Sequence, residues 1–184
     1  MHQPPKICLD ANVLWSPQQR NLLLQMASRQ ALAVFWSWQI EEEWLRNTTP
    51  VQRNRLEAGT LPIIRYHFPE AILETSGENA DTGMTSTSDR HVALTAIAGA
   101  PCTLLTWNIR HFDRAALARG RVALQTPDHF LSEIFDAQPA GTFDLAKEAW
   151  SNLRKSAPDW EAWFERLTAN RLTGFVHRLR EFRA

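Results

Sequence analysis

The amino-acid sequence predicts an α/β fold: a three-layer α/β/α sandwich with a mostly parallel sheet, extended by helices at the C-terminal end. Short apolar runs alternate with segments of helical periodicity over residues 1–136, and repeated strand–helix units of this kind build parallel sheets. After the break at residues 136–141, amphipathic segments follow with no apolar strand between them. We therefore divide the 184 residues into an α/β domain, residues 1–136, and a helical extension, residues 141–184.

The first half of the α/β domain supplies two clear strands and one weaker strand. Residues 7–10 and 33–36 are short apolar runs, typical of buried parallel strands. Ser16 and Pro17 open a helix between them, because serine caps helix N-termini and proline fits the first helical turn. After the second strand we expect a helix through Glu43 and another that starts at residues 49–50. Residues 61–64, Leu-Pro-Ile-Ile, are predicted as the weaker strand.

The second half repeats the alternation after a polar loop. Residues 75–88 are rich in Gly, Ser, Thr, Asn and acids, which indicates a loop. The elements expected after it are a helix at 89–98, a strand at 102–106, a short basic helix at 113–118, a strand at 121–124 and a helix capped at 126–128 that runs through Phe135.

The extension carries three amphipathic helical segments. Apolar residues fall on one face in each, for example Leu145, Ala149 and Leu153 in the first, at the spacing of a helix that buries one side. Such short helices must cover their apolar faces with the sandwich, a second copy or another protein. We expect most of them to pack within their own chain, and we expect most of the eight tryptophans to lie in the core or in interfaces.

Composition describes a soluble globular chain with a sizeable core. Hydrophobic residues make up 44%, the formal net charge is zero and the pI is about 7.0, so bulk charge does not point to nucleic acid. Cys8 and Cys102 are expected to be free core thiols in a reducing compartment. The sequence starts without an apolar signal segment and has no run of about 18 apolar residues, which predicts a cytoplasmic protein without a membrane span.

Acidic and polar residues lie where parallel strands are expected to end. Asp10 closes the first strand, and ligands of open α/β sheets bind at the carboxyl ends of strands. Desolvating a carboxylate costs several kcal/mol, and a divalent cation shared with other acids offsets that cost. Glu43 and Asp89 are the candidate further ligands. The later strand ends in Thr106, Trp107 and Asn108, and Asp113 follows.

Each of these residues also has an interpretation without a ligand. Asp10 can cap a helix, and Asp89 can be stabilised by the dipole of the helix that it opens. Glu43 is one of three consecutive glutamates and can belong to a solvated face. Asn108 can be a turn residue that ends a strand. The prediction of a site therefore depends on all of these residues together, each at the end of the expected strand or helix.

Five segments together resemble a known family. Residues 7–14, 36–47, 89–96, 106–112 and 126–131 resemble, in that order, the motifs of PIN-domain nucleases. The subgroup that the chain resembles best is that of VapC-like toxins with a C-terminal helical extension. The resemblance implies a metal-dependent endoribonuclease that hydrolyses RNA phosphodiester bonds, as the toxin of a type II toxin–antitoxin pair.

The resemblance also implies roles for particular residues. Asp10, Glu43 and Asp89 would bind Mg²⁺ or Mn²⁺, which prefer oxygen ligands, and Asn12 and Asn108 would orient carboxylates or waters. The implied partners are RNA, an antitoxin protein and a second copy in a homodimer. Two departures leave three acids at motif positions: residues 85–88 are Thr-Ser-Thr-Ser where further acids are common, and His111 replaces an aspartate. His111 is expected to lie at the surface or face a phosphate, and Asp113 supplies a fourth acid only if its loop bends inward.

Basic residues near the expected site are candidates for RNA binding, because phosphate contacts dominate such affinity. They are Arg46, Arg90, Arg110 and Arg114. A solvated basic face is the alternative for the cluster around Arg110. Two alternatives to the nuclease also stay open. One is a degenerate PIN domain that binds RNA or protein without cleaving; the other is an aspartyl-phosphate phosphatase, which Asn12 disfavours because that chemistry uses a second aspartate there.

Overall fold

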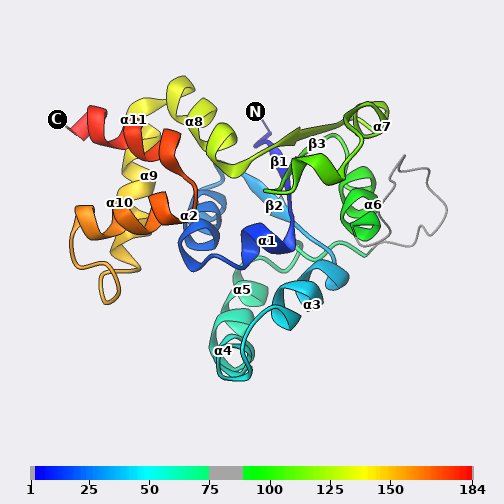
Figure 1. Cartoon of the computed structure of the whole chain (residues 1–184), viewed down its shortest axis with the longest axis horizontal. Helices are drawn as coiled ribbons and strands as arrows, with labels where there is room; N and C mark the ends of the chain where they lie inside the picture. The colour runs from blue at the N-terminus through cyan, green and yellow to red at the C-terminus, as the bar shows by residue number, and fades with distance from the viewer. Residues whose placement is uncertain (1–2, 75–88, 184) are drawn as a thin grey trace.

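The sheet consists of four parallel strands in the computed structural model, which describes residues 3–74 and 89–183 (Figure 1). The strands are β1 (Lys6–Leu9), β2 (Ala33–Phe35), β3 (Cys102–Leu105) and β4 (Val122–Gln125), in the order β2-β1-β3-β4. The α/β fold predicted from the sequence is confirmed. The loop predicted at residues 75–88 lies outside the described residues.

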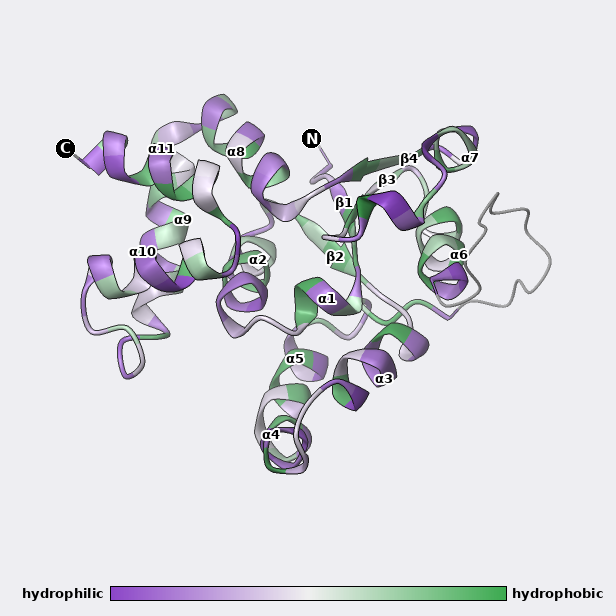
Figure 2. Cartoon of the chain, in the orientation of Figure 1, coloured by the Kyte–Doolittle hydropathy of each residue, from purple (hydrophilic) through white to green (hydrophobic). Residues whose placement is uncertain are grey.

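The strands form because their side chains are apolar on both faces. Ile7, Cys8 and Leu9 of β1 are fully buried, and both cysteines are free thiols. Figure 2 shows the hydrophobic colour concentrated in the strands, whereas the surface helices alternate between hydrophobic and hydrophilic residues. Strands buried on both faces are typical of parallel sheets covered by helices.

The helices of this domain connect the strands. Between β1 and β2 lie α1 (Ala11–Leu14) and α2 (Pro17–Ser28). Between β2 and β3 lie α3 (Trp38–Arg46), α4 (Pro50–Arg55), the π-helix η1 (Leu56–Thr60), α5 (Leu61–His67) and α6 (Arg90–Ala98). Between β3 and β4 lie the 3-10 helix η2 (Ile109–His111) and α7 (Arg114–Arg119). Because β2 and β3 flank β1 on opposite sides, right-handed connections place α2 and α6 on opposite faces, as Figure 1 shows. Ser16 and Ser37 cap α2 and α3 as N-cap residues.

The weaker strand predicted at residues 61–64 is wrong. These residues begin α5, and Pro62 lies in its first turn, directly after the π-helix η1. Leu61 and Ile64 are buried while Ile63 is exposed, so the apolar run has helical rather than strand periodicity. A run of four apolar residues does not distinguish the two structures by itself.

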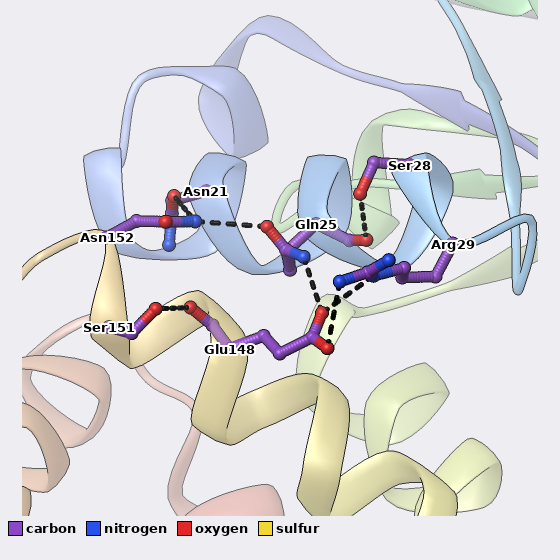
Figure 3. A network of polar contacts seen from close by, with 7 residues as sticks. All are labelled: Asn21, Gln25, Ser28, Arg29, Glu148, Ser151 and Asn152. Atoms are coloured by element: carbon purple, nitrogen blue, oxygen red, sulfur yellow. Dashed lines mark hydrogen bonds and ion pairs between the residues drawn. The ribbon is translucent and has the colours of Figure 1, made fainter.

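Four helices follow β4 and pack on the side of α2. They are α8 (Pro127–Ala137), α9 (Pro139–Ser151), α10 (Trp160–Ala169) and α11 (Thr173–Arg183). Figure 3 shows the polar contacts that join α9 to α2: Glu148 accepts hydrogen bonds from Arg29 and Gln25, and Asn152 donates to Gln25 at 3.0 Å. The extension is therefore fixed to the α/β domain.

The extension also has an apolar core of its own. Trp163, Phe164 and Phe175 are fully buried, which confirms that the tail packs within its chain. Asp128 of α8 accepts hydrogen bonds from the backbone N–H groups of Gly174 and Phe175, at 3.0 and 2.9 Å, and so caps the first turn of α11. Among residues 3–74 and 89–183, no helix is long and apolar enough to cross a membrane.

Candidate active site

The candidate site lies where the chain changes direction across the sheet. From β1 the chain adds β2 on one side and later β3 on the other, and ligands of open parallel sheets bind at such a switch point, beyond the carboxyl ends of the strands. Asp10 follows β1 and Thr106 follows β3. The N–H of Asp10 donates to the carbonyl of Leu105 at 3.1 Å, so the two strand ends stay side by side.

The carboxylate of Asp10 is held by two polar side chains. The Thr106 hydroxyl and the Asn12 amide donate to Oδ2 at 2.5 and 2.7 Å, and Asn12 also donates to Thr106 at 3.1 Å. Asp10 is only 2% exposed. It occupies the N-cap position of α1 but makes no capping hydrogen bond, so the capping alternative does not account for it. The structure places Asn12 and Thr106 in contact with Asp10, as expected for supporting residues.

The two residues after Thr106 support this hydrogen-bond network through their backbone N–H groups. The N–H of Trp107 donates to Asn12 Oδ1 at 3.1 Å, and the N–H of Asn108 donates to the Thr106 hydroxyl at 3.0 Å. Asn108 is exposed. The strand end therefore fixes Asn12 and Thr106, which in turn fix Asp10.

The charge of Asp10 is destabilised by its surroundings. Burial raises the pKa of Asp10 from its ordinary value of 3.8 to about 6, and the Thr106 hydrogen bond opposes part of this shift. The charges of Glu43 and Asp89 raise the pKa of Asp10 further. Glu43 and Asp89 therefore belong to the electrostatic surroundings of Asp10 despite their separation in sequence.

Three consecutive glutamates on α3 have three different environments. Glu41 is buried and pairs with Arg65 and the Trp36 indole, so its role is structural. Glu42 is exposed. Glu43 is partly buried, and its Oε2 atom is enclosed without a hydrogen-bond partner among the described residues. His91 Nε2 lies 3.0 Å from this oxygen, within ion-pair distance. The two atoms do not form a hydrogen bond, and His91 Nε2 has no other hydrogen-bond partner among the described residues.

Asp89 precedes α6 and contacts a histidine from another element. It is 7% exposed and stands at the N-cap without a capping hydrogen bond, which argues against a purely helix-capping role. His111 Nδ1, in η2, lies 2.7 Å from Asp89 Oδ2. The histidine at the expected position of an aspartate is therefore partly exposed and paired with an acid of the site. Sequence reasoning missed both histidine–acid contacts, because each joins distant elements.

The donor set fits a hard divalent cation in chemistry, although its side chains are not closed around one. No group of three or more His, Cys, Asp or Glu side chains within the described part of the chain is arranged to hold a metal ion. Two observations nevertheless favour a cation: the pKa of Asp10, which burial and then the charges of Glu43 and Asp89 raise, and the enclosed Glu43 oxygen, which accepts no hydrogen bond from the described residues. A bound cation would satisfy both, with Asp10, Glu43 and Asp89 as its oxygen ligands.

Of the other predicted residues, some lie beside the candidate site and others have structural roles. Asp113 caps α7, accepting from the N–H groups of Ala115 and Ala116 at 2.8 and 3.0 Å, so its carboxylate is committed to that helix. Arg46 lines a hollow of about 720 Å³ together with Glu43 and His91. Arg110 and Arg114 are exposed, and Arg114 donates to the Leu124 carbonyl at 3.2 Å. Arg90 begins α6, directly after Asp89.

The C-terminal part of the chain is similar to a known protein family. Residues 127–181 match the family model of the VapC50 C-terminal domain. No curated protein and no solved structure matches the chain. The matched segment runs from the start of α8 into α11, so it covers the C-terminal helices and not the acidic site. The similarity is therefore to the C-terminal domain of VapC50 and is confined to these helices.

Proposed function

We propose that this chain is an endoribonuclease that requires Mg²⁺ or Mn²⁺ and serves as the toxin of a type II toxin–antitoxin pair. The observation that carries the proposal is the buried carboxylate of Asp10 at the switch point, held there by Thr106 and Asn12. Burial raises the pKa of this carboxyl, and the charges of Glu43 and Asp89 raise it further. The VapC50 match of the C-terminal helices supports the toxin assignment.

The proposed chemistry is hydrolysis of an RNA phosphodiester bond. A bound Mg²⁺ or Mn²⁺ lowers the pKa of a coordinated water and neutralises charge on the phosphoryl oxygens. Asp10, Glu43 and Asp89 would hold the ion. Thr106 and Asn12 keep the Asp10 carboxylate in one orientation through hydrogen bonds of 2.5 and 2.7 Å, and preorganised ligands of this kind need little rearrangement on binding.

The expected macromolecular partners are RNA and an antitoxin. Arg46, Arg90, Arg110 and Arg114 would contact RNA phosphates near the site. Apolar side chains are exposed along α3 to α5, including Trp38 at 46%, Ile63 at 60% and Tyr66 at 81%. Exposed apolar groups of this kind favour a protein interface, and Trp38 also lines the hollow beside Glu43. We expect the antitoxin to bind there, and a second copy to pair through the sandwich.

The experiment is cleavage of an end-labelled RNA by the purified chain in Mg²⁺, Mn²⁺ or EDTA. Asp10→Asn, Glu43→Gln and Asp89→Asn should each reduce cleavage by at least about a hundredfold, since each removes a charged ligand. Glu42→Gln is the matched control, because Glu42 is the exposed neighbour of Glu43. Cleavage that survives in EDTA or in Asp10→Asn would contradict the proposal.

A degenerate PIN domain that binds RNA without cleaving it is the second candidate. The observation that favours it is the lack, within residues 3–74 and 89–183, of a closed group of metal-binding side chains. This candidate predicts RNA binding that is insensitive to Mg²⁺, with no cleavage by the wild-type chain. The same experiment therefore separates the two functions.

A further inference from the structure

The loop between α10 and α11 touches the strand end that forms the candidate site. The guanidinium of Arg171 lies over the Trp107 ring, 4.4 Å from its centroid. The Trp107 indole N–H donates to Gln19 Oε1 at 3.1 Å, and the Gln19 amide donates to the Asn170 carbonyl at 2.6 Å. Gln19 is buried, so these contacts hold the loop of the extension against the indole.

Trp107 in turn belongs to the network around Asp10. Its backbone N–H donates to Asn12 Oδ1 at 3.1 Å, and Asn12 donates to Asp10 at 2.7 Å. A short chain of contacts therefore runs from Arg171 through Trp107 and Asn12 to the buried acid. The extension therefore places a positive charge over Trp107, two residues beyond the carboxyl end of β3.

Arg171 has the chemistry of a phosphate ligand. It is exposed, and within residues 3–74 and 89–183 it forms no ion pair, whereas Arg178 pairs with Asp136 and Arg29 with Glu148. The flat face of its guanidinium rests on the indole, which orients the group. Its N–H donors lie in the guanidinium plane, so two of them can donate hydrogen bonds to two oxygens of one phosphate.

The backbone of Arg171 is also one that usually favours glycine. Its φ angle is 68°, and the residue follows the C-terminal end of α10. Gln30, after α2, has a φ angle of 58°. A side chain at such a helix end is strained relative to glycine. Because glycine adopts this φ angle without strain, Arg171→Gly removes the arginine side chain without disfavouring the backbone of the fold.

We propose that Arg171 binds a phosphate of single-stranded RNA that flanks the scissile bond, so that the C-terminal extension supplies part of the RNA-binding surface. This inference rests on the proposed function, because it takes RNA as the ligand. It adds a residue far in sequence from the motifs that resemble PIN domains.

The test is RNA binding by the full chain, measured by fluorescence anisotropy in EDTA so that cleavage does not remove the ligand. Arg171→Gly should bind a labelled single-stranded RNA roughly tenfold more weakly, and equally so for RNAs of different sequence. The slope of log K against log salt should become shallower by about 0.7, the value for one phosphate contact on a single strand. Arg171→Lys should keep most of that slope.

The matched controls separate binding from folding. Gln30→Gly makes the same backbone change at another helix end, and Arg154→Ala removes another arginine stacked on a tryptophan, 4.8 Å from the Trp150 centroid. Both controls should bind RNA as the wild type does. The melting temperature of Arg171→Gly should be unchanged or raised, as in Gln30→Gly.

Two results would overturn the proposal. Equal affinity and equal salt slope in Arg171→Gly would reduce Arg171 to a packing residue, even if the wild-type chain binds and cleaves RNA. A loss of affinity that accompanies a lowered melting temperature, absent in Gln30→Gly, would make its role structural. Failure of the proposed function is a different outcome, in which the wild-type chain itself binds or cleaves no RNA.

Discussion

Replacing Asp10 by asparagine should stabilise the metal-free protein at neutral pH. Asp10 is buried, and its charge is opposed both by desolvation and by Glu43 and Asp89. Asparagine has nearly the same shape, and its carbonyl oxygen can accept the hydrogen bonds from Thr106 and Asn12 that Asp10 Oδ2 accepts. The substitution therefore removes an unfavourable charge while it keeps the contacts.

The pKa of Asp10 sets the size and sign of this effect. It rises from 3.8 to about 6 on folding, and a rise of about two units corresponds to about 3 kcal/mol. The folded protein therefore keeps a proton that the unfolded chain loses. The stability associated with the protonated carboxyl is fully present below about pH 4 and is lost as the pH rises through about 6.

The assay is urea unfolding of the wild type and Asp10→Asn between about pH 4 and pH 8, in EDTA. We expect Asp10→Asn to have the larger free energy of unfolding by about 1–3 kcal/mol near pH 7.5, and no advantage near pH 4. Glu42→Gln, at an exposed carboxylate, should show no such difference. An Asp10→Asn protein that is less stable at pH 7.5, or a stability difference that does not change with pH, would show that the Asp10 charge does not destabilise the fold.

Three further predictions follow from the surroundings of other residues. Glu43→Gln should abolish Mn²⁺ binding measured by calorimetry with little loss of stability. Glu41→Gln should lower the free energy of unfolding by about 1–2 kcal/mol, because it weakens the contact of the buried Glu41 carboxylate with Arg65, which solvent partly screens; the opposite ranking would exchange their roles. Arg110→Ala should weaken binding to all RNA sequences with a shallower salt dependence, and an effect confined to one sequence would indicate base readout instead. A chain truncated after residue 138 should be insoluble or unstable in expression tests, since it loses the helices that pack on α2 and α8; a soluble, monodisperse product would show that the extension is a separate arm.

Local patterns in the sequence predict most of the fold. Apolar runs such as residues 7–10 and 102–106 are short and bounded by polar residues, and Ser16 and Thr126 cap helices where a helix start is expected. Residues 61–64 were predicted wrongly because the choice between strand and helix depends on the packing of α5, which four residues do not encode.

The candidate site was predictable only in part. A strand-end acid such as Asp10 is visible in the sequence, and a resemblance to motifs selects Glu43 and Asp89. The sequence does not show that Glu41 is the buried, paired glutamate, that Asp113 is committed to capping α7, or that His111 contacts Asp89. These facts depend on how separate elements come together, as does the contact of Arg171 with Trp107.

A crystal structure of the chain grown with Mn²⁺, with anomalous diffraction measured to locate the ion, tests the proposed metal site. We expect one strong anomalous peak at the carboxyl ends of β1 and β3, with oxygens of Asp10, Glu43 and Asp89 about 2.1 Å away, the distance expected for a small hard cation. The same peak should be missing in Asp10→Asn crystals. A site without a peak, or acids that point to different faces of the sheet, would contradict the claim that these residues form a metal-dependent active site.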